Sequence, residues 1–240
     1  MRILDLFCKA GGAAKGLKDA FHDASIIGVD IKPQKNYPFQ FIQADALTYP
    51  TKGFNFIWAS PPCQAHTVLK GAAWDKANYT AKHPDLIPQT RAILESSGVP
   101  YIIENVPGAP LLHPIMLCGS HFGLTTNNGH QLRRHRIFEI KKTHMIKPIL
   151  APGPCKHTSP TIGIFGNKAR NTGAEKRHYS KPKATRGSPP KDILLTLTDA
   201  RQAMGCPWMS FAELSEAIPP AYSRFIVSKF SMLDFTMESR

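Results

Sequence analysis

The sequence predicts an α/β protein in which a mostly parallel sheet is covered by helices on both faces. Short apolar runs rich in β-branched and aromatic residues recur along the chain, and segments with helical spacing of apolar residues separate several of them. Strands that alternate with helices usually form a parallel sheet. The expected strands are 2–7, 26–30, 39–43, 54–58, 101–103, 115–118 and 137–140, and the expected helices are 13–21, 84–97, 199–204, 211–217 and 221–230.

Glycines or acidic residues follow the first three expected strands. Gly11 and Gly12 separate the first strand from its helix, a geometry that lets backbone N–H groups approach a nucleotide-like ligand, although the G-x-G-x-x-G pattern is absent. Asp30 ends the second strand, where an acid can accept hydrogen bonds from ribose hydroxyls. Asp45 follows the third and can accept from an adenine amino group. Each acid also suits a helix N-cap or a solvated loop, and these alternatives stay open.

The next strand ends in two prolines and a cysteine. Pro61 and Pro62 donate no backbone hydrogen bonds, so Cys63 falls on a loop at the carboxyl end of a strand, where open α/β sheets bind ligands. A cysteine beside an apolar strand is more often a buried small hydrophobe than a nucleophile. Glu104 follows the next buried strand in the same way, and the cationic run 133–136 precedes the last one.

Positive charge is concentrated in one part of the chain. The 240 residues carry a formal net charge of +13, which favours a polyanionic partner, and nucleic acid is the first candidate. Between Lys141 and Lys191, twelve lysines and arginines face a single acid, Glu175. A disordered basic loop is one interpretation, but the strand-like residues 161–166 favour a small, partly β module that binds nucleic acid. We therefore expect three parts: 1–140, 141–191 and 192–240.

Composition argues for a soluble protein of a reducing compartment. No apolar stretch approaches the roughly 20 residues of a membrane span, and the N-terminus runs directly into a strand, so we expect no signal peptide and a cytoplasmic location. The five cysteines are scattered, odd in number and without a C-x-x-C pair, which indicates free thiols. The spacing of Cys118, His121, Cys155 and His157 is too loose to predict a zinc site, and we expect no metal.

The ordered motifs D-L-F-x-x-A-G-G, G-V-D-I, A-D-A-L, S-P-P-C-Q, E-N-V and R-H-R resemble those of the DNA cytosine-5 methyltransferases. The P-P-C-Q and E-N-V pair is highly specific in this order and spacing, and the closing A-I-P-P extends the similarity over nearly the whole chain. The size is similar to that of small phage- or prophage-borne members. The resemblance implies a Rossmann-like S-adenosylmethionine-dependent methyltransferase fold, S-adenosylmethionine as cofactor and double-stranded DNA as partner. It also implies that 141–191 recognise the target and that 192–240 pack back onto the catalytic domain.

The resemblance also assigns catalytic roles. A thiolate that adds to carbon 6 of cytosine makes carbon 5 nucleophilic enough to accept a methyl group, and Cys63 takes this role. Glu104 takes the hydrogen bond to ring N3, for which burial at a strand end is suited. Arg134 and Arg136 are expected to hold the base carbonyl and position the loop, with Arg133 as an alternative. The base has to leave the duplex to reach such a pocket, so base flipping is implied.

Two further sets of residues follow from the same resemblance. The cofactor is expected to contact Asp5, Phe7, Lys9, Gly11, Asp30, Ile31, Asp45, Ala46, Pro61 and Pro219. Nucleic acid is expected to contact Gln64, Arg133, Lys168, Arg170, Lys176 and Arg177. The sequence indicates no obligate protein partner.

Lys9 departs from the family pattern, which usually has glycine at this position. The lysine can turn outward, reach the methionine carboxylate of the cofactor, favour an altered sulfonium donor, or weaken cofactor binding.

Two alternatives to a DNA methyltransferase stay open. One is an RNA cytosine-5 methyltransferase, against which the long basic insertion argues, and the other is a DNA-binding relative with impaired or altered cofactor use.

Overall fold

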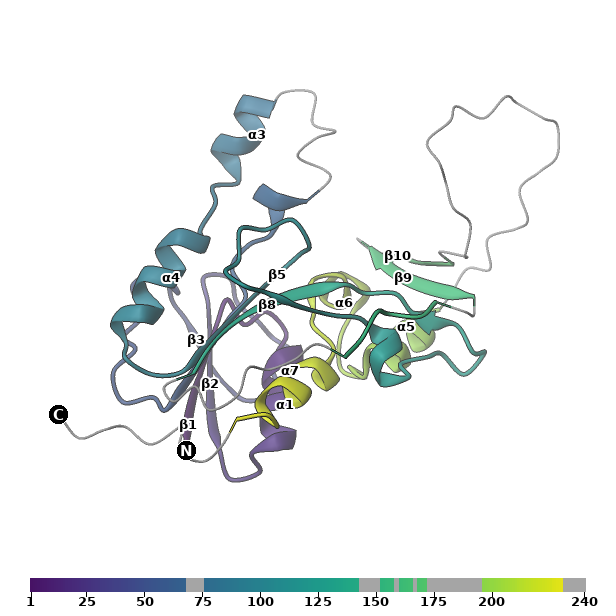
Figure 1. Ribbon diagram of the computed structural model, residues 1–240, viewed down its shortest axis with the longest axis horizontal. Coiled ribbons are helices and arrows are strands. Elements are labelled where there is room, and N and C mark those ends of the chain that lie inside the picture. Colours follow the sequence, from purple (N-terminus) through teal and green to yellow (C-terminus); the bar gives the residue numbers. More distant parts are fainter. Residues whose placement is uncertain (68–75, 143–151, 158–159, 166–167, 172–195, 231–240) are drawn as a thin grey trace. The chain divides into compact units, whose positions relative to one another are not determined.

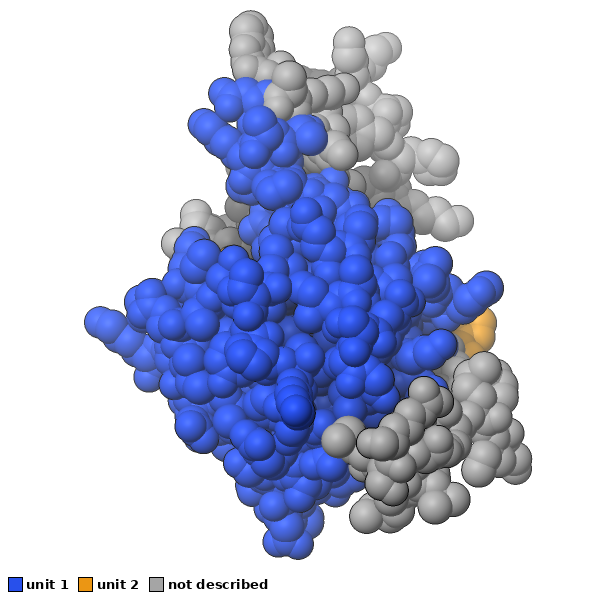
Figure 2. Space-filling view, turned by 90° about the vertical axis from the view of Figure 1, so that its left-hand side faces the viewer, with its two compact units in different colours: residues 1–117, 135–151, 217–240 blue, residues 118–134, 152–216 orange. Residues whose placement is uncertain are grey.

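In the computed structural model, the chain folds into two compact units. Unit 1 comprises residues 1–117, 135–151 and 217–240, and unit 2 comprises 118–134 and 152–216 (Figure 2). These units do not coincide with the expected boundaries after residues 140 and 191, because the chain leaves unit 1 at residue 118 and unit 2 extends to Glu216. The residues that the structure describes are 1–67, 76–142, 152–157, 160–165, 168–171 and 196–230.

Unit 1 is built on a seven-stranded sheet (Figure 1). Its strands are β1 (Arg2–Leu6), β2 (Ser25–Asp30), β3 (Gln40–Gln43), β4 (Phe56–Ala59), β5 (Tyr101–Asn105), β6 (Ile115–Leu117) and β8 (Arg136–Lys141). They lie in the order β3-β2-β1-β4-β5-β8-β6. β1 to β5 pair in parallel, and β8 runs antiparallel to both of its neighbours. The predicted α/β class with a mostly parallel sheet is confirmed.

Helices cover both faces of this sheet. The helical elements of unit 1 are α1 (Gly12–Ala20), η1 (Gln64–His66), α3 (Lys76–Lys82), α4 (Ile87–Ser96) and α7 (Pro220–Val227). Phe138 and Glu139 are consecutive on β8, so their side chains point to opposite faces. Glu139 bonds Arg91 of α4, whereas Phe138 packs on Tyr222 of α7, so α4 and α7 lie on opposite faces. No helix among the described residues is long and apolar enough to cross a membrane.

The C-terminal helix of unit 1 packs directly against its first helix, and Figure 1 shows α7 beside α1. A Cβ atom on Gly16 would lie 2.0 Å from the carbonyl oxygen of Pro220, so this close approach requires glycine. The Ser223 hydroxyl donates to the carbonyl of Ala13 at 2.8 Å. Residues from the two ends of the sequence thus build one helical layer.

Unit 2 contains a small sheet with the strand order 10-9-7 and two short helices. Its elements are η2 (Gly119–Phe122), β7 (Gln131–Leu132), β9 (Thr161–Phe165), β10 (Lys168–Asn171), α5 (Leu197–Met204) and α6 (Phe211–Glu216). β9 confirms the strand expected at 161–166 over residues 161–165. α5 begins with a capping box between Thr196 and Asp199. It is capped at its C-terminus by Gly205, which has a φ of +68° and so lies in the left-handed region that favours glycine.

Candidate active site

The carboxyl ends of β1, β2, β4 and β5 lie at one edge of the sheet, because these strands run parallel. The chain order reverses between β1 and β4, the position at which open α/β sheets bind their ligands. The loop that carries Cys63 starts at this point, where the Ser60 amide donates to the Leu6 carbonyl at 3.1 Å. The sequence thus predicted correctly that this loop follows a buried strand, and ligand binding at this edge stays a prediction.

Hydrogen bonds hold the Cys63 loop in place from two sides. The side-chain amide of Asn105, at the end of β5, donates to the buried carbonyl of Pro61 at 3.0 Å. The Tyr79 hydroxyl of α3 donates to the Gln64 carbonyl at 3.2 Å, and the Cys63 carbonyl accepts from the His66 amide at 2.9 Å. Cys63 therefore sits on a fixed loop at the start of η1, and it is half-buried rather than sealed.

The two cysteines of unit 1 have different environments. Cys8 is buried, and burial together with the neighbouring carboxyls of Asp5 and Asp30 raises the pKa of its thiol far above the usual range. A thiol in that setting does not ionise and is a poor nucleophile. Cys63 is the partly exposed thiol, so it is the candidate nucleophile of this unit.

Glu104 and Arg136 meet at the same edge. The Arg136 Nε lies 3.0 Å from Glu104 Oε1, and the two side chains are 15% and 8% exposed. β5 and β8 are antiparallel neighbours, and this pairing sets residues 104 and 137–138 beside each other, so the sheet itself delivers the arginine to the glutamate. Two residues that the sequence assigned to one catalytic site are thus in contact, and their catalytic roles stay a prediction.

Arg134 has different partners from Arg136. Its guanidinium donates to the carbonyl oxygens of Ser215 at 2.8 Å and Ile164 at 3.4 Å, all within unit 2, and the side chain is buried. These bonds join the segment before β8 to β9 and α6. The predicted contact of Arg134 with a base stays a prediction. Arg133 is exposed.

Asp30 is buried, and two backbone amides orient its carboxylate. Its Oδ2 accepts from the amide of Lys9 at 3.2 Å and its Oδ1 from the amide of Lys32 at 3.0 Å. A carboxylate has about four acceptor positions, so these two bonds orient the group without saturating it. Ile31, the next residue, exposes 66% of its surface although it is apolar. An oriented acid beside an exposed aliphatic side chain suits a ligand with hydroxyls and a flat apolar ring.

The loop between β1 and α1 has a strained backbone. Phe7 and Lys9 adopt positive φ values of 56° and 47°, and Gly11, the N-cap of α1, has a φ of 78°. Positive φ suits glycine and costs about 1 kcal/mol or more for a residue with a Cβ atom. Lys9 therefore occupies a backbone conformation that suits glycine better than a residue with a side chain.

Asp5 is enclosed by protein. Its carboxyl is buried, and Oδ2 accepts from the Tyr37 hydroxyl at 3.1 Å. Burial raises the pKa of Asp5 to about 8, with the nearby Asp30 adding to the rise and the Tyr37 hydrogen bond opposing it. Since the folded pKa lies above the ordinary value, this group makes folding less favourable as pH rises from about 4 to about 8. Its immediate partner is Tyr37 rather than solvent.

The other expected site residues are distributed over both units. Asp45 is exposed on a turn, as in the solvated-loop alternative, and its carboxylate accepts from the Leu47 amide at 2.9 Å. The Oε1 atom of Gln64 is buried and has no hydrogen-bond partner among the described residues. Ala46 and Pro219 are buried, Lys168 and Arg170 belong to β10, and Lys176 and Arg177 lie outside the described residues.

Three residues that hold the site were not predicted. Asn105 stands in the E-N-V motif, but a side-chain bond to a residue 44 positions away leaves no trace in spacing. Tyr37 and Tyr79 belong to segments without a periodic apolar pattern, and their hydroxyls find Asp5 and the Gln64 carbonyl only through the fold.

A comparison with solved structures identifies the fold. A methyltransferase of Entamoeba histolytica superposes with a TM-score of 0.61 over 95% of this chain and 97% of that chain, at 12% sequence identity. The chain has the S-adenosylmethionine-dependent methyltransferase fold. The identity is low, so the match is one of fold. No protein-family model matches the chain, and no curated protein matches it.

Two other methyltransferases are similar at much lower TM-scores. An RNA methyltransferase from Salinibacter ruber, solved in complex with S-adenosyl-L-homocysteine, has a TM-score of 0.33 at 13% identity and covers 65% of this chain and 86% of its own. An antibiotic-related methyltransferase has a TM-score of 0.34 at 13% identity and covers 58% and 86%. Similarity at this level adds nothing to the assignment of substrate.

Proposed function

We propose that this chain is a DNA cytosine-5 methyltransferase that transfers a methyl group from S-adenosylmethionine to a flipped-out cytosine through a covalent adduct on Cys63. One arrangement carries the proposal. The half-buried thiol of Cys63 lies on a loop that Asn105 ties to β5, and the residue before Asn105 is Glu104, which is paired with Arg136. A thiol on the loop after β4 and a carboxyl near the end of β5, two neighbouring parallel strands, are the two groups that this reaction needs on one base.

In the proposed reaction, the sulfur of Cys63 forms a bond to carbon 6 of the cytosine ring. The electron pair of the 5,6 double bond shifts by conjugation through carbon 4 to N3, and N3 takes a proton from the Glu104 carboxyl, which regains it when the ring is restored. Carbon 5 then forms a bond to the methyl carbon of S-adenosylmethionine, the bond from that carbon to the sulfonium sulfur breaks, and S-adenosylhomocysteine is the leaving group. Loss of the carbon 5 proton to a base and cleavage of the sulfur–carbon bond restore the double bond and the thiolate. Arg136 holds Glu104 and, in the proposed complex, donates to the base carbonyl.

The residues at the ends of β1 and β2 fit S-adenosylmethionine, which supplies an electrophilic methyl group on its sulfonium when bound. Asp30, oriented by the amides of Lys9 and Lys32, is suited to accept from ribose hydroxyls. Ile31 offers an exposed aliphatic surface for the adenine ring. The N-terminus of α1 at Gly11 favours the methionine carboxylate, because helix N-termini attract negative charge.

Charge supports DNA as the substrate. The basic segment between Lys141 and Lys191 is long enough to supply both phosphate and base contacts, and Lys168, Arg170, Lys176 and Arg177 belong to it. In unit 1, the buried Oε1 of Gln64 lies beside the nucleophile without a partner among the described residues. A buried acceptor of this kind calls for a donor, and an exocyclic amine of the DNA near the flipped base is a suitable one.

A mechanism-based trap tests the proposal. A DNA duplex that contains 5-fluorocytosine is incubated with S-adenosylmethionine and resolved on a denaturing gel. Fluorine at carbon 5 cannot leave as a proton, so the adduct persists only if Cys63 attacks and methyl transfer follows. We expect a covalent band with the wild-type chain and none with Cys63→Ser. Cys206→Ser, which alters a buried cysteine of unit 2, serves as the control and should keep the band.

The alternatives give different results in the same assay. Adduct on an RNA that contains 5-fluorocytidine, without adduct on DNA, would assign the enzyme to RNA. Tight, salt-sensitive DNA binding without adduct on either would instead indicate a DNA-binding relative that does not use the cofactor. Because the target sequence is unknown, the duplex should be a pool with random sequence around the modified base.

A further inference from the structure

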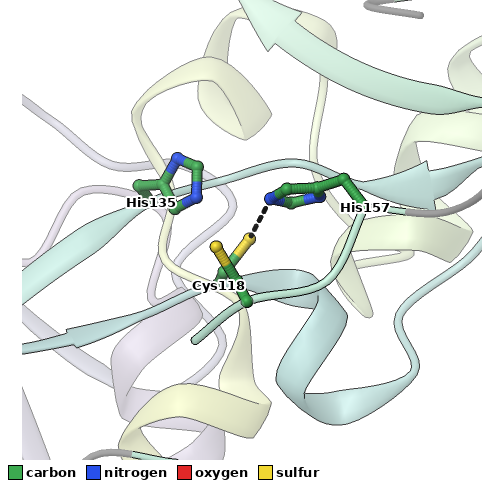
Figure 3. A group of neighbouring side chains, drawn as sticks. Cys118, His135 and His157 are labelled. Atoms are coloured by element: carbon green, nitrogen blue, oxygen red, sulfur yellow. Dashed lines mark hydrogen bonds between the residues drawn. The ribbon is translucent and has the colours of Figure 1, made fainter. Parts of the chain in front are cut away.

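Two cysteines and two histidines converge in the structure, and the proposed function does not use them. Cys118, His135, Cys155 and His157 each offer one metal-binding atom, and these four atoms all lie within 4.8 Å of one another. Figure 3 shows Cys118, His135 and His157 turned toward a common point. The sequence spacing had suggested His121 as a partner of Cys118, and it predicted no metal site. His121 has another role, because its Nδ1 accepts from the Cys118 amide at 3.3 Å.

The cluster is held together within unit 2 and at its boundary. Cys118, Cys155 and His157 belong to unit 2. His135 follows directly on Arg134, the last residue of that segment of unit 2, so the peptide bond keeps it beside the cluster. The four residues come from three segments: the start of η2, the residue before β8, and the segment 152–157. A bound ion would therefore join segments that are far apart in the sequence.

The geometry matches a tetrahedral ion. Zinc bonds of about 2.3 Å to sulfur and about 2.1 Å to nitrogen separate two tetrahedral ligand atoms by about 3.6 Å. The Cys118 Sγ lies 3.7 Å from the His157 Nε2. Cys118 is fully buried and the other three are half-buried, so the cluster is partly shielded from water.

The composition of the cluster distinguishes between the possible explanations. Two thiolates and two imidazoles form one of the usual ligand sets of structural zinc. A disulfide between Cys118 and Cys155 would use the two sulfurs, but it would give no reason for two imidazoles to converge on the same point. The four protein ligands also complete a tetrahedron, which leaves no open position for a substrate.

We propose that Cys118, His135, Cys155 and His157 bind a structural Zn²⁺ ion. The ion ties the segment 152–157 and the start of η2 to the chain on either side of His135. Arg134 and Arg136 flank that residue, so the site fixes the backbone from which both arginines project. This inference does not depend on the proposed methyltransferase activity.

Metal analysis of the full-length protein tests the site. The chain is produced with added zinc, purified under reducing conditions and analysed by inductively coupled plasma mass spectrometry. We expect about one zinc per chain, set by one closed four-ligand site. Removing the ion with a chelator should lower the thermal midpoint, and adding Zn²⁺ back should restore it.

Matched variants identify the ligands. His135→Ala, His157→Ala and Cys155→Ser should each lower zinc occupancy at least tenfold after dialysis against a weak chelator. His121→Ala and Cys206→Ser change a neighbouring histidine and a buried cysteine outside the cluster, and both should keep the ion. Because a ligand variant that fails to fold also loses zinc, Co²⁺ is added to the chelated wild-type protein as well. Absorption bands of tetrahedral thiolate coordination are expected.

Three results would overturn the proposal. One is a reduced, folded wild-type protein that neither contains zinc nor takes it up. The second is zinc loss in His121→Ala with zinc retained in His135→Ala. The third is a Cys118–Cys155 disulfide found by mass spectrometry in protein purified without reductant after expression in a reducing cytoplasm.

Discussion

Two glutamate–arginine pairs of unit 1 involve β8, and they connect different parts of the structure. Glu139 accepts two hydrogen bonds from Arg91 of α4, at 2.9 and 2.7 Å, and a third from the Leu112 amide at 2.8 Å. Arg136 and Glu104 instead join β8 to β5, two strands that the sheet ladder already holds together. The first pair binds a helix and a loop to the sheet, whereas the second adds little to an existing connection.

From this difference we infer which pair contributes to stability and which to the proposed reaction. A buried ion pair between neighbouring strands, placed at the ligand-binding edge, is not needed to define the sheet. A bidentate ion pair between the sheet and a covering helix fixes that helix on the sheet, as apolar packing would otherwise do. We therefore expect loss of Glu104 to affect activity and loss of Arg91 to affect folding.

The largest effect is expected for Glu104→Gln. Glutamine keeps the size of the side chain but cannot supply a proton to ring N3, so methyl transfer should fall by about 100-fold or more. The thermal midpoint should stay close to that of the wild type. Transfer of a labelled methyl group to DNA, measured beside a thermal melt, checks both statements. A stable variant with wild-type transfer would remove Glu104 from the reaction.

A smaller effect, on stability instead of activity, is expected for Arg91→Ala. The substitution leaves the buried Glu139 with the Leu112 amide as a remaining donor, and the free energy of unfolding should fall by about 2 kcal/mol. Denaturant unfolding measures the loss, and Arg91→Lys should recover part of it through a single contact. The rate per folded molecule should be unchanged at low temperature. Equal stability losses for Arg91→Ala and Glu104→Gln would contradict the contrast between the pairs.

The smallest effect is expected at Lys9, where the site carries backbone strain that the α4 region lacks. Glycine accepts the φ of 47° without the Cβ penalty, so Lys9→Gly should raise the free energy of unfolding by about 1 kcal/mol. Lys9→Ala removes the charge but keeps the strain. If glycine tightens S-adenosylmethionine binding in a calorimetric titration and alanine does not, the backbone limits affinity. If both variants tighten binding, the positive charge of Lys9 limits affinity. Looser binding by both variants would show that the lysine contacts the cofactor.

Local patterns were sufficient for much of unit 1. The apolar runs around Ile27, Ile57 and Ile102 predicted strands because each is short, β-branched and bounded by turn residues. The same patterns did not predict α3 or the short β7, since neither has a long apolar stripe. Element boundaries moved by one to three residues, as at α4, which begins at Ile87 rather than at 84.

The sequence by itself determined the α/β class, the position of Cys63 after one buried strand and of Glu104 near the end of the next, and the concentration of positive charge between Lys141 and Lys191. These are properties of neighbouring residues, so the order of the chain contains them. Only the tertiary structure decided that Arg136 rather than Arg134 pairs with Glu104, that Asn105 holds the Cys63 loop, and that His135 rather than His121 joins Cys118, Cys155 and His157. Each of these contacts joins residues that are close in space because strands pair and loops return, and spacing along the chain carries no record of that.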